Sequence, residues 1–398
     1  MNAEKQLGNV SPLNFFDEVR EGWRFTDEIL IHDVTLRDGE QTPGLVFEPE
    51  DRLRIARALD DLGVDRIEAG MPVVSQGDRE GLAAIADAGL NAEIWGFGRC
   101  LPYDVELNAE CGVEHVTLEI AISELKMGAY GLSREKVVRR MLSAMERARE
   151  LGLSFAFMPV DLTRADMGFA ERVLRAAVED GGADEIVVVD TIGVTSPDAI
   201  GYLTRQIGRW VDVPLSVHCH NDFGLGVANT LAGLKNGARC AHVSLNLLGE
   251  RAGNVDLAEL VMSLRLLYGQ DLSIHTERLA ATARVMEEIT GYEMPPNKAI
   301  VGKHVFARES GGVVQQLLTS PAAVEPYDPA LVGLERSVVL GKKSGRYSIE
   351  HARRRLGLEL ADDEVDVVLK QVKELSRERR DLISDDDFRA IVADAQQD

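Results

Sequence analysis

Two histidines, His218 and His220, stand at the end of an apolar run with one residue between them. Successive side chains on a β-strand point to opposite faces, so both imidazoles face the same side if this run is a strand. Asp38 follows another apolar run, directly after Arg37. Two imidazoles and a carboxylate form a metal site that leaves coordination positions open for substrate and water. These residues predict a divalent metal centre; a surface-turn ion pair and buried structural histidines are the alternative interpretations.

Arg37 adds a second chemical element to this prediction. A metal binds a 2-oxo acid through its carboxylate and keto oxygens and polarises the carbonyl as a Lewis acid. An adjacent guanidinium holds a developing oxyanion or a carboxylate through charge-assisted hydrogen bonds. The combination predicts carbon–carbon bond chemistry on a 2-oxo acid, in the direction of either addition or cleavage.

Further polar residues stand at the ends of other apolar runs. Glu68, Arg99 and Thr191 each lie at or just after the end of a run, and Asn254 follows the run that ends at Leu247. Asn254 is suited either to cap the following helix or to offer its amide oxygen to the metal. Each residue alone is compatible with a structural role, so the prediction of a site depends on their convergence at one edge of the fold.

The elements that must position these residues are short apolar runs that alternate with amphipathic ones. Eight strand–helix pairs predict a (β/α)8 TIM barrel, whose active site lies at the carboxyl ends of the strands. A doubly wound sheet is the structural alternative, but no glycine-rich phosphate-binding motif follows the first run. The expected strands are Ile29–Leu36, Arg66–Ala69, Ala92–Phe97, Val113–Ile120, Ser154–Val160, Glu185–Asp190, Pro214–His218 and Ala241–Leu247. The expected helices include Pro49–Leu62, Arg134–Leu151, Phe169–Glu179, Pro197–Trp210, Gly224–Asn236 and Val255–Leu267.

A smaller region follows the barrel. The alternation stops after about residue 270, and helical patterns over Ser273–Thr290, Tyr347–Leu356, Asp362–Arg379 and Asp385–Ala395 replace it. We therefore expect an N-terminal extension (1–27), a catalytic barrel (28–270) and a smaller, mainly helical C-terminal region (271–398). We expect this last region to pack on the barrel mouth or on a partner subunit.

Composition argues against several classes of function. Of the 398 residues, 45% are hydrophobic and 28% are charged, as in ordinary globular proteins. The net charge of −22 argues against a nucleic-acid partner, because phosphate binding needs a basic face. No apolar run is long enough for a membrane span, and the first residues lack the pattern of a signal peptide. The four cysteines show no CxxC spacing, so we expect reduced thiols in a cytoplasmic protein.

Three motifs resemble those of the homocitrate synthase and 2-isopropylmalate synthase family, whose superfamily also includes HMG-CoA lyases. They are LRDGEQTPG (36–44), HCHNDFGLGVANTL (218–231) and GERAGN (249–254), and the resemblance runs from about residue 28 to 347. It implies a metal-dependent barrel that condenses acetyl-CoA with a 2-oxo acid, with Mn²⁺, Mg²⁺ or Zn²⁺ as the metal. It also implies a homodimer in which the C-terminal region of one chain covers the barrel of the other.

The resemblance extends to individual residues. Asp38, His218 and His220 match the metal ligands of the family, and Asn254 matches an additional ligand or a residue beside the ligands. Arg37 matches the catalytic arginine. We further expect Glu68 and Thr191 to be catalytic, and Gln41, Arg99 and Arg308 to bind substrate.

Two departures from the family concern proton transfer. Val313 stands where the family has a histidine that is a proposed acid or base, and Val160 stands where an acidic residue is common. A valine cannot transfer a proton, so the base that deprotonates acetyl-CoA is open among His304, Tyr327 and a metal-bound water. Arg308 replaces another histidine and adds a cation that suits a more anionic substrate.

Three functions are compatible with these observations. The first is an acetyl-CoA-dependent synthase, which the long C-terminal region favours. The second is a metal-dependent lyase or aldolase that cleaves a 2- or 3-hydroxy acid or a hydroxyacyl-CoA. The third is a non-catalytic relative, against which the retention of Arg37 and all three ligands argues. Metal content, CoA affinity and thiol release distinguish the three, and the identity of the 2-oxo acid stays open.

Overall fold

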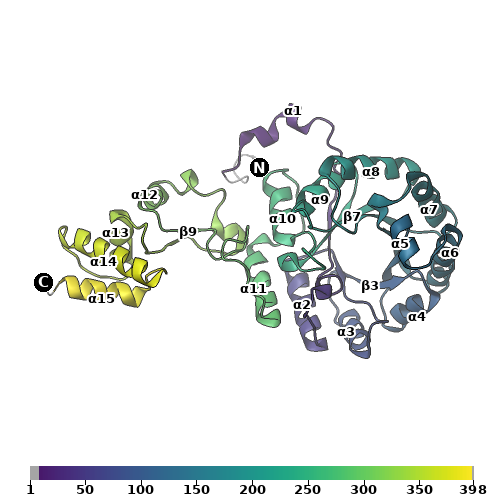
Figure 1. Cartoon of the computed structure of the whole chain (residues 1–398), viewed down its shortest axis with the longest axis horizontal. Coiled ribbons are helices and arrows are strands. Elements are labelled where there is room, and N and C mark those ends of the chain that lie inside the picture. The colour runs from purple at the N-terminus through teal and green to yellow at the C-terminus, as the bar shows by residue number, and fades with distance from the viewer. Residues whose placement is uncertain (1–8, 397–398) are drawn as a thin grey trace. The chain divides into compact units, whose positions relative to one another are not determined.

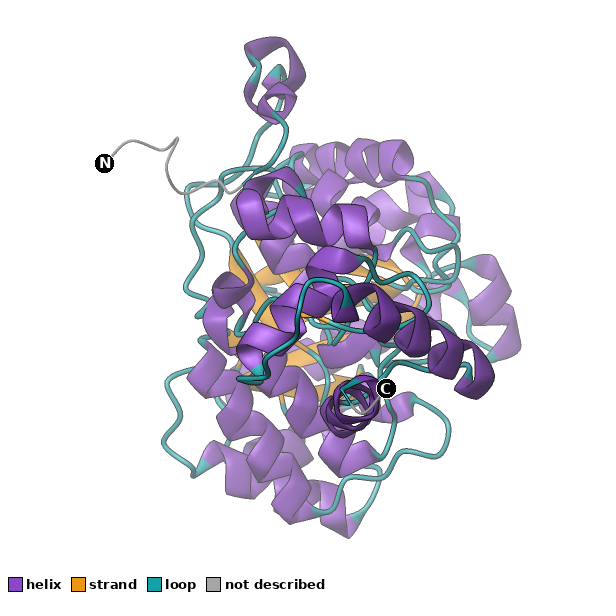
Figure 2. Ribbon diagram, turned by 90° about the vertical axis from the view of Figure 1, so that its left-hand side faces the viewer, coloured by secondary structure: helices purple, strands orange, loops and turns teal. Residues whose placement is uncertain are grey.

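Eight parallel strands close into a barrel in the computed structural model, which describes residues 9–396. Each strand pairs with the next along the chain, and β1 pairs with β8 to complete the ring. Figure 1 shows the helices surrounding these strands, and Figure 2 shows the strands enclosed by them. The predicted TIM barrel is confirmed. Its strands are β1 (Leu30–Asp33), β2 (Arg66–Glu68), β3 (Glu93–Arg99), β4 (His115–Ala121), β5 (Ser154–Val160), β6 (Glu185–Asp190), β7 (Leu215–Cys219) and β8 (Cys240–Val243).

The strands form where short apolar runs are covered on both faces. All six residues of β6 are buried, and four of them are Ile or Val, as expected for a parallel strand between a barrel interior and a helix. The strands β1 and β8 are shorter than predicted. After β8 the backbone takes positive φ at Asn246 (54°) and Leu247 (66°), which ends the extended conformation early.

Helices follow each strand and begin at recognisable caps. Ser196 accepts a hydrogen bond from the backbone N–H of Ala199 at the start of α8, and Pro197 occupies the first turn. Gly63 ends α2 in the left-handed region, with φ of 89°. The helices around the barrel are α2 (Pro49–Leu62), α3 (Gln76–Ala86), α4 (Pro102–Glu110), α5 (Glu124–Ala129), α6 (Arg134–Glu150), α7 (Met167–Glu179), α8 (Pro197–Trp210), α9 (Gly226–Leu234) and α10 (Leu257–Leu266).

The compact unit that contains the barrel runs from Pro12 to Glu293. It includes α1 (Asp17–Arg20) and α11 (Leu279–Thr290), and α11 packs on α2. Residues placed in the N-terminal extension pack on the same unit, since Trp23 lies 5.1 Å from the ring of Tyr268. The unit therefore extends beyond the expected barrel bounds of 28–270, because both flanking segments bury side chains against it. Residues 1–8 of the extension lie outside the described residues.

A second compact unit contains the described residues before Pro12 and those from Met294 onward. Its elements are a two-stranded sheet, β9 (Ala307–Arg308) with β10 (Ser337–Val338), and the helices α12 (Gly311–Thr319), α13 (Arg346–Arg355), α14 (Glu364–Arg379) and α15 (Asp385–Ala395). The last three helices share an apolar core that includes Ile349, Val368 and Phe388. The predicted helical C-terminal region is thus confirmed.

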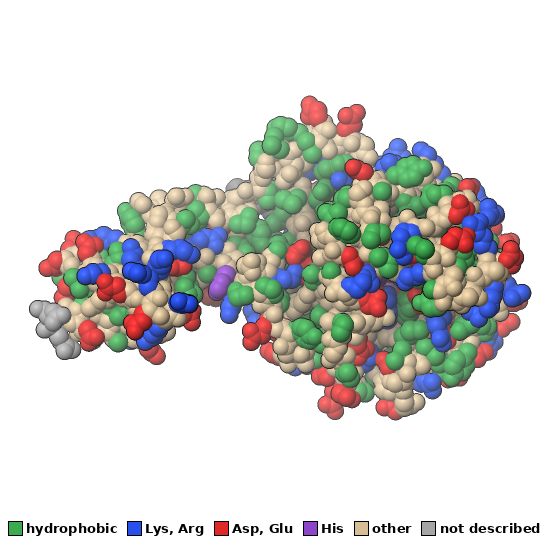
Figure 3. Space-filling model, in the orientation of Figure 1, with side chains coloured by type: hydrophobic (Ala, Val, Ile, Leu, Met, Phe, Trp, Pro, Cys, Tyr) green, Lys and Arg blue, Asp and Glu red, His purple; other side chains and the backbone are tan. Residues whose placement is uncertain are grey.

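The surface and the thiols are consistent with the compositional expectations. Acidic and basic side chains are interspersed on the face of the barrel unit seen in Figure 3. None of the four cysteines forms a disulfide, and all four are buried. Among residues 9–396, no helix has both the length and the apolar character that crossing a membrane requires.

Candidate active site

A tight turn after β1 positions Asp38. The backbone N–H groups of Arg37, Asp38 and Gly39 all donate to the carbonyl oxygen of Val34, at 2.8–3.1 Å. Asp33 holds the start of this turn, because its carboxylate accepts the backbone N–H of Thr35 at 2.9 Å. The turn follows the carboxyl end of β1, where the residues of a TIM-barrel active site are expected.

The three predicted metal ligands converge at this end of the barrel. The Nε2 atom of His218 lies 3.4 Å from Oδ2 of Asp38 and 3.3 Å from Nε2 of His220. The Nε2 atom of His220 lies 3.8 Å from the same carboxylate oxygen. One candidate donor atom from each residue lies within 4.8 Å of the others, and all three residues are buried. This is the two-imidazole, one-carboxylate set that the spacing predicts.

The donor atoms of this cluster fit a cation. Oδ2 of Asp38 and the Nε2 atoms of both histidines face one another, and Oδ1 of Asp38 is buried with no hydrogen-bond partner among the described residues. Burial would raise the pKa of Asp38, but Arg37 and the two histidines outweigh it and hold that pKa well below its ordinary range. Burial lowers the pKa of His220 to about 4. At neutral pH the cluster therefore offers an ionised carboxylate and an imidazole lone pair, which are the protonation states that metal binding requires.

Arg37 is fixed beside these ligands by two carboxylates. Its Nε donates to Glu68 at 2.5 Å, and its Nη1 donates to Asp38 at 2.8 Å. The guanidinium also lies over the ring of Phe97, 4.0 Å from the centroid. Its Nη2 is buried and has no partner among the described residues. Arg37 is therefore immobilised and keeps one donor for a substrate oxygen, and Glu68 acts on it from a fully buried position.

A cavity of about 470 Å³ opens over this cluster. Arg37, Asp38, His218 and His220 line its floor together with three other predicted site residues, Gln41, Arg99 and Thr191. The cavity has the size expected for a small-molecule site, and polar or charged residues make up half of its lining. The structure thus brings seven of the predicted residues to one cavity.

Three of the predicted site residues form hydrogen bonds within the barrel unit that the sequence did not indicate. Arg99 makes a two-pronged ion pair with Asp104, at 2.8 Å for each nitrogen. Thr191 accepts the backbone N–H of Asp161 through its hydroxyl oxygen, at 2.8 Å. Asn254 is buried and its amide donates to the carbonyl of Leu248 at 3.4 Å.

The capping interpretation of Asn254 is wrong. Asp256 caps α10, because its side chain accepts the backbone N–H of Glu259. Asn254 lies two positions before that cap, so its side chain does not cap the helix. The other interpretation, an amide oxygen near the metal, stays a prediction.

Arg308 belongs to the second compact unit. Its guanidinium donates to the backbone carbonyls of Val305, Ala307 and Val324, at 2.8–3.1 Å. These contacts brace a loop within that unit. A role for Arg308 in substrate binding stays a prediction, as do acid–base roles for His304 and Tyr327, which lie in the same unit.

Four charged residues of the cavity were not predicted from the sequence: Glu119 on β4, Lys126 on α5, Arg140 on α6, and Glu250. Burial raises the pKa of Glu119 from its ordinary value, against the opposing effect of Arg37. The alternation along β4 offered a signal, because Thr117 faces the interior and Glu119 stands two residues later, near the carboxyl end. Val160, which replaces an expected acid, lines the same cavity.

Comparisons with known families decide the assignment. The family model described as HMGL-like matches residues 28–286, and the model described as homocitrate synthase post-HMGL domain-like matches residues 300–380. The chain belongs to the HMGL-like family. Within this family, the second match places it with proteins that carry the homocitrate-synthase type of C-terminal region.

The curated relatives of the chain are synthases. A homocitrate synthase AksA of Methanopyrus kandleri is 44% identical over 94% of this chain and 95% of its own length. The AksA of Methanothermobacter thermautotrophicus is 39% identical over 96% of this chain and 97% of its own length. An (R)-citramalate synthase CimA of Methanocaldococcus jannaschii is 42% identical over 92% of this chain and 74% of its own length. The predicted synthase function, an acyl transfer that joins acetyl-CoA to a 2-oxo acid, is confirmed at this level.

Solved structures support the barrel. HMG-CoA lyases from Bacillus subtilis and Brucella melitensis match with TM-scores of 0.61 and 0.60, at 19% and 20% identity. They cover 68% and 66% of this chain, and the matches span 96% and 100% of their own chains. At this identity the likeness shows the fold alone.

Proposed function

We propose that this chain is a metal-dependent acyltransferase that condenses acetyl-CoA with a 2-oxo dicarboxylic acid. The observation that carries the proposal is the convergence of Asp38, His218 and His220 in one cavity beside the free Nη2 of Arg37. When bound, a divalent ion would be held by those three residues and would supply Lewis-acid polarisation of the keto group. Mn²⁺, Mg²⁺ and Zn²⁺ all accept such ligands, and two imidazoles favour Mn²⁺ and Zn²⁺ over Mg²⁺.

Arg37 has the geometry to bind the acceptor. Its unpartnered Nη2 is buried at the cavity floor, where it donates to the acceptor's carboxylate or to the oxygen that gains charge as the carbon–carbon bond forms. Glu68, which is fully buried, holds the guanidinium in this orientation by accepting its Nε–H. Gln41 and Thr191 line the same cavity, where they orient the acceptor.

Glu119 is our candidate for the base. It lines the cavity, and its raised pKa makes the carboxylate a stronger base toward the methyl group of acetyl-CoA. Glu119 takes a methyl proton and the resulting carbanion forms the new bond to the keto carbon. The π electrons of the carbonyl move to the keto oxygen, which takes a proton from water and becomes a hydroxyl. Hydrolysis of the thioester then releases the CoA thiol. In contrast, burial raises the pKa of Tyr327 to about 12, which leaves its phenol protonated at neutral pH.

The acceptor is proposed to carry a second carboxylate, as 2-oxoglutarate does. Lys126 and Arg140 line the cavity and supply two cations, whereas Arg99, which also lines it, is paired with Asp104. Two homocitrate synthases are matched over 95% and 97% of their own length, and a probable 2-isopropylmalate synthase is matched over 92% of its own, so the choice of a second carboxylate rests on the cations of the cavity. The alternative, a lyase, has support only from structures that share less than a quarter of their sequence with this chain.

Release of free CoA thiol tests this proposal. Purified protein with Mn²⁺ is incubated with acetyl-CoA and 2-oxoglutarate, 2-oxoisovalerate, pyruvate or oxaloacetate. We expect release with 2-oxoglutarate, lost in Arg37→Gln and specifically weakened for dicarboxylic acceptors in Lys126→Met. Preference for pyruvate or 2-oxoisovalerate would overturn the acceptor assignment, and silence with every acceptor would direct the same assay to cleavage of the hydroxy-acid products.

We further propose that the chain acts as a cytoplasmic homodimer. The absence of disulfides among four cysteines agrees with a reducing compartment. The assembly follows from the family resemblance, and light scattering tests it. A monomer at micromolar concentration would refute the dimer.

A further inference from the structure

The metal ligand His218 has a second histidine behind it. The Nδ1 atom of His218 lies 3.3 Å from Nδ1 of His242, and the two rings meet edge to face, with centroids 5.3 Å apart. His242 lies on β8, beside the strand that carries His218, and both side chains are at most 2% exposed. No other hydrogen-bond partner of His218 Nδ1 is found among residues 9–396.

The geometry assigns the two nitrogens of His218 different tasks. Its Nε2 faces Asp38 and His220, so this nitrogen must present its lone pair to a metal held by the three residues. A neutral imidazole carries one proton, so that proton must then sit on Nδ1. In that tautomer the acceptor of the Nδ1–H is the lone pair of His242 Nδ1, so the proton of His242 must sit on Nε2, which is buried and has no hydrogen-bond partner among the described residues.

We propose that His242 is a positioning residue that fixes the tautomer and ring orientation of His218 for metal binding. The inference rests on the proposed metal site at Asp38, His218 and His220. Metal-bound histidines commonly donate their second N–H to a carboxylate or a carbonyl. Here the acceptor is a neutral imidazole, which orients the ligand without placing another negative charge beside the metal.

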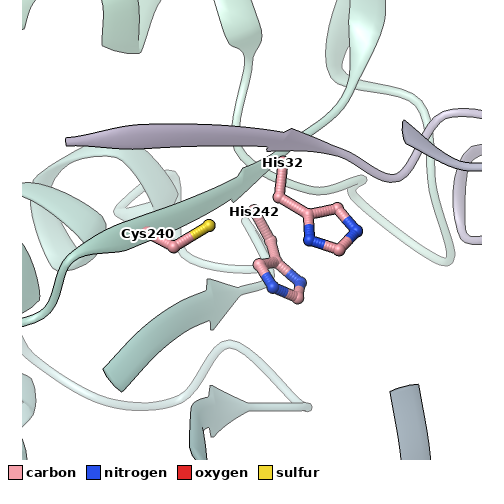
Figure 4. Close-up of side chains that lie close together, drawn as sticks. All are labelled: His32, Cys240 and His242. Atoms are coloured by element: carbon pink, nitrogen blue, oxygen red, sulfur yellow. The ribbon is translucent and has the colours of Figure 1, made fainter. Parts of the chain in front are cut away.

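His242 is itself held by its neighbours. The ring of His32 lies 4.3 Å from that of His242 at a tilt of 32°, and Trp95 lies 5.4 Å from His32. Figure 4 shows the two imidazoles side by side, contributed by β1 and β8. The strand register places His32 directly opposite His242. The adjacent, tilted ring of His32 therefore restricts the rotation of His242 and keeps its Nδ1 aimed at His218.

Cys240 offers a competing interpretation of the same side chains. Its sulfur and one nitrogen from each of His32 and His242 lie within 4.8 Å of one another, a spacing compatible with a separate metal site. That site would need His242 to turn its lone pair away from His218. In addition, the guanidinium of Arg66 lies near both Cys240 and His32, and its positive charge would repel a metal ion bound there. The contact that the structure contains, 3.3 Å between the two Nδ1 atoms, favours the positioning role.

A matched pair of variants tests the inference. Asn places an amide oxygen near the position of the Nδ1 acceptor, whereas Leu has the same shape and no acceptor. The affinity of purified, metal-stripped protein for Zn²⁺ is measured by competition with a chromophoric chelator for the parent, His242→Asn and His242→Leu. The metal-to-chain ratio and the far-ultraviolet circular dichroism of each apoprotein are measured in parallel.

We expect one metal per chain in the parent and a Zn²⁺ affinity that is about 10–100-fold weaker in His242→Leu, with His242→Asn close to the parent. Saturating metal should restore kcat to His242→Leu, because the residue acts through the ligand. Equal losses in the two variants would overturn the inference in favour of packing alone. Two metals in the parent and one in both variants would overturn it in favour of the site with Cys240. A parent that binds no metal would instead refute the proposed function.

Discussion

The buried ion pair between Arg37 and Glu68 makes a quantitative prediction. Glu68 is 0% exposed and its Oε2 accepts Nε of Arg37 at 2.5 Å, while its Oε1 has no partner among the described residues. Replacing Arg37 by Met removes that partner and leaves a carboxylate without compensation in the barrel interior. Breaking a buried pair in this way costs about 3–5 kcal/mol. Asp38 loses a partner as well, so we expect the upper part of that range.

The second variant separates stability from catalysis. In Arg37→Met with Glu68→Leu, the buried charge is also removed, and apolar replacement of a buried pair is often neutral. We therefore expect the double variant to regain at least half of the stability that the single variant loses. Both variants should be inactive, because each lacks the guanidinium that binds the acceptor.

Urea unfolding in metal-free buffer, followed by circular dichroism, measures these differences. Metal must be absent because an ion at Asp38 would replace part of the missing positive charge. A single variant as stable as the parent would refute the reasoning. So would a double variant that is no more stable than the single one, since the loss would then not come from the isolated carboxylate of Glu68.

Three further predictions concern protonation, catalysis and backbone geometry. Burial raises the pKa of Asp33 to about 7. Between pH 4 and pH 7 the folded protein therefore holds a proton that the unfolded chain releases. The stability that this proton contributes is present below pH 4 and is lost as the pH rises through 7. Asp33→Asn should therefore stabilise the barrel at pH 8 by up to about 4 kcal/mol and by little at pH 4.5, and an equal effect at both pH values would contradict the assignment. Glu119→Gln should lower kcat by about 10²–10⁴-fold and slow deuterium exchange of the acetyl-CoA methyl group, with KM for the 2-oxo acid unchanged. Glu250→Gln is the matched control for that variant, because Glu250 lines the same cavity but pairs with Arg251, and an equal loss there would refute Glu119 as the base. Gly253 has φ of 86°, and an added Cβ would lie 1.8 Å from the carbonyl oxygen of Leu247. Gly253→Ala should therefore unfold at a lower urea concentration than the control Gly237→Ala, whose added Cβ meets nothing within 4 Å.

The fold and the metal ligands could be predicted because both depend on local periodicity. Strands buried on both faces read as apolar runs, so β5 and β6 were predicted with the bounds that the structure gives them. The two-residue spacing of His218 and His220 fixes a common face on any strand. Asp38 joined them because parallel strands of a barrel bring their carboxyl ends to one edge.

The residues that escaped prediction depend on contacts between distant segments. Glu119 lies within β4, and only barrel closure brings it to the cavity that Arg37 occupies. Arg99 stands at the expected strand end, but Asp104, on the following helix, accepts hydrogen bonds from two of its three guanidinium nitrogens. The contact between His242 and His218 joins two strands whose register is set by the closed barrel. The sequence of either strand alone does not specify this last contact.

Crystals grown with Zn²⁺ test the proposed metal centre, through an anomalous difference map recorded at the zinc absorption edge. We expect a strong peak about 2.0–2.2 Å from an Asp38 carboxylate oxygen, His218 Nε2 and His220 Nε2, and its loss in Asp38→Ala. A map without density between these three residues, or with its peak between His32, Cys240 and His242, would contradict the account.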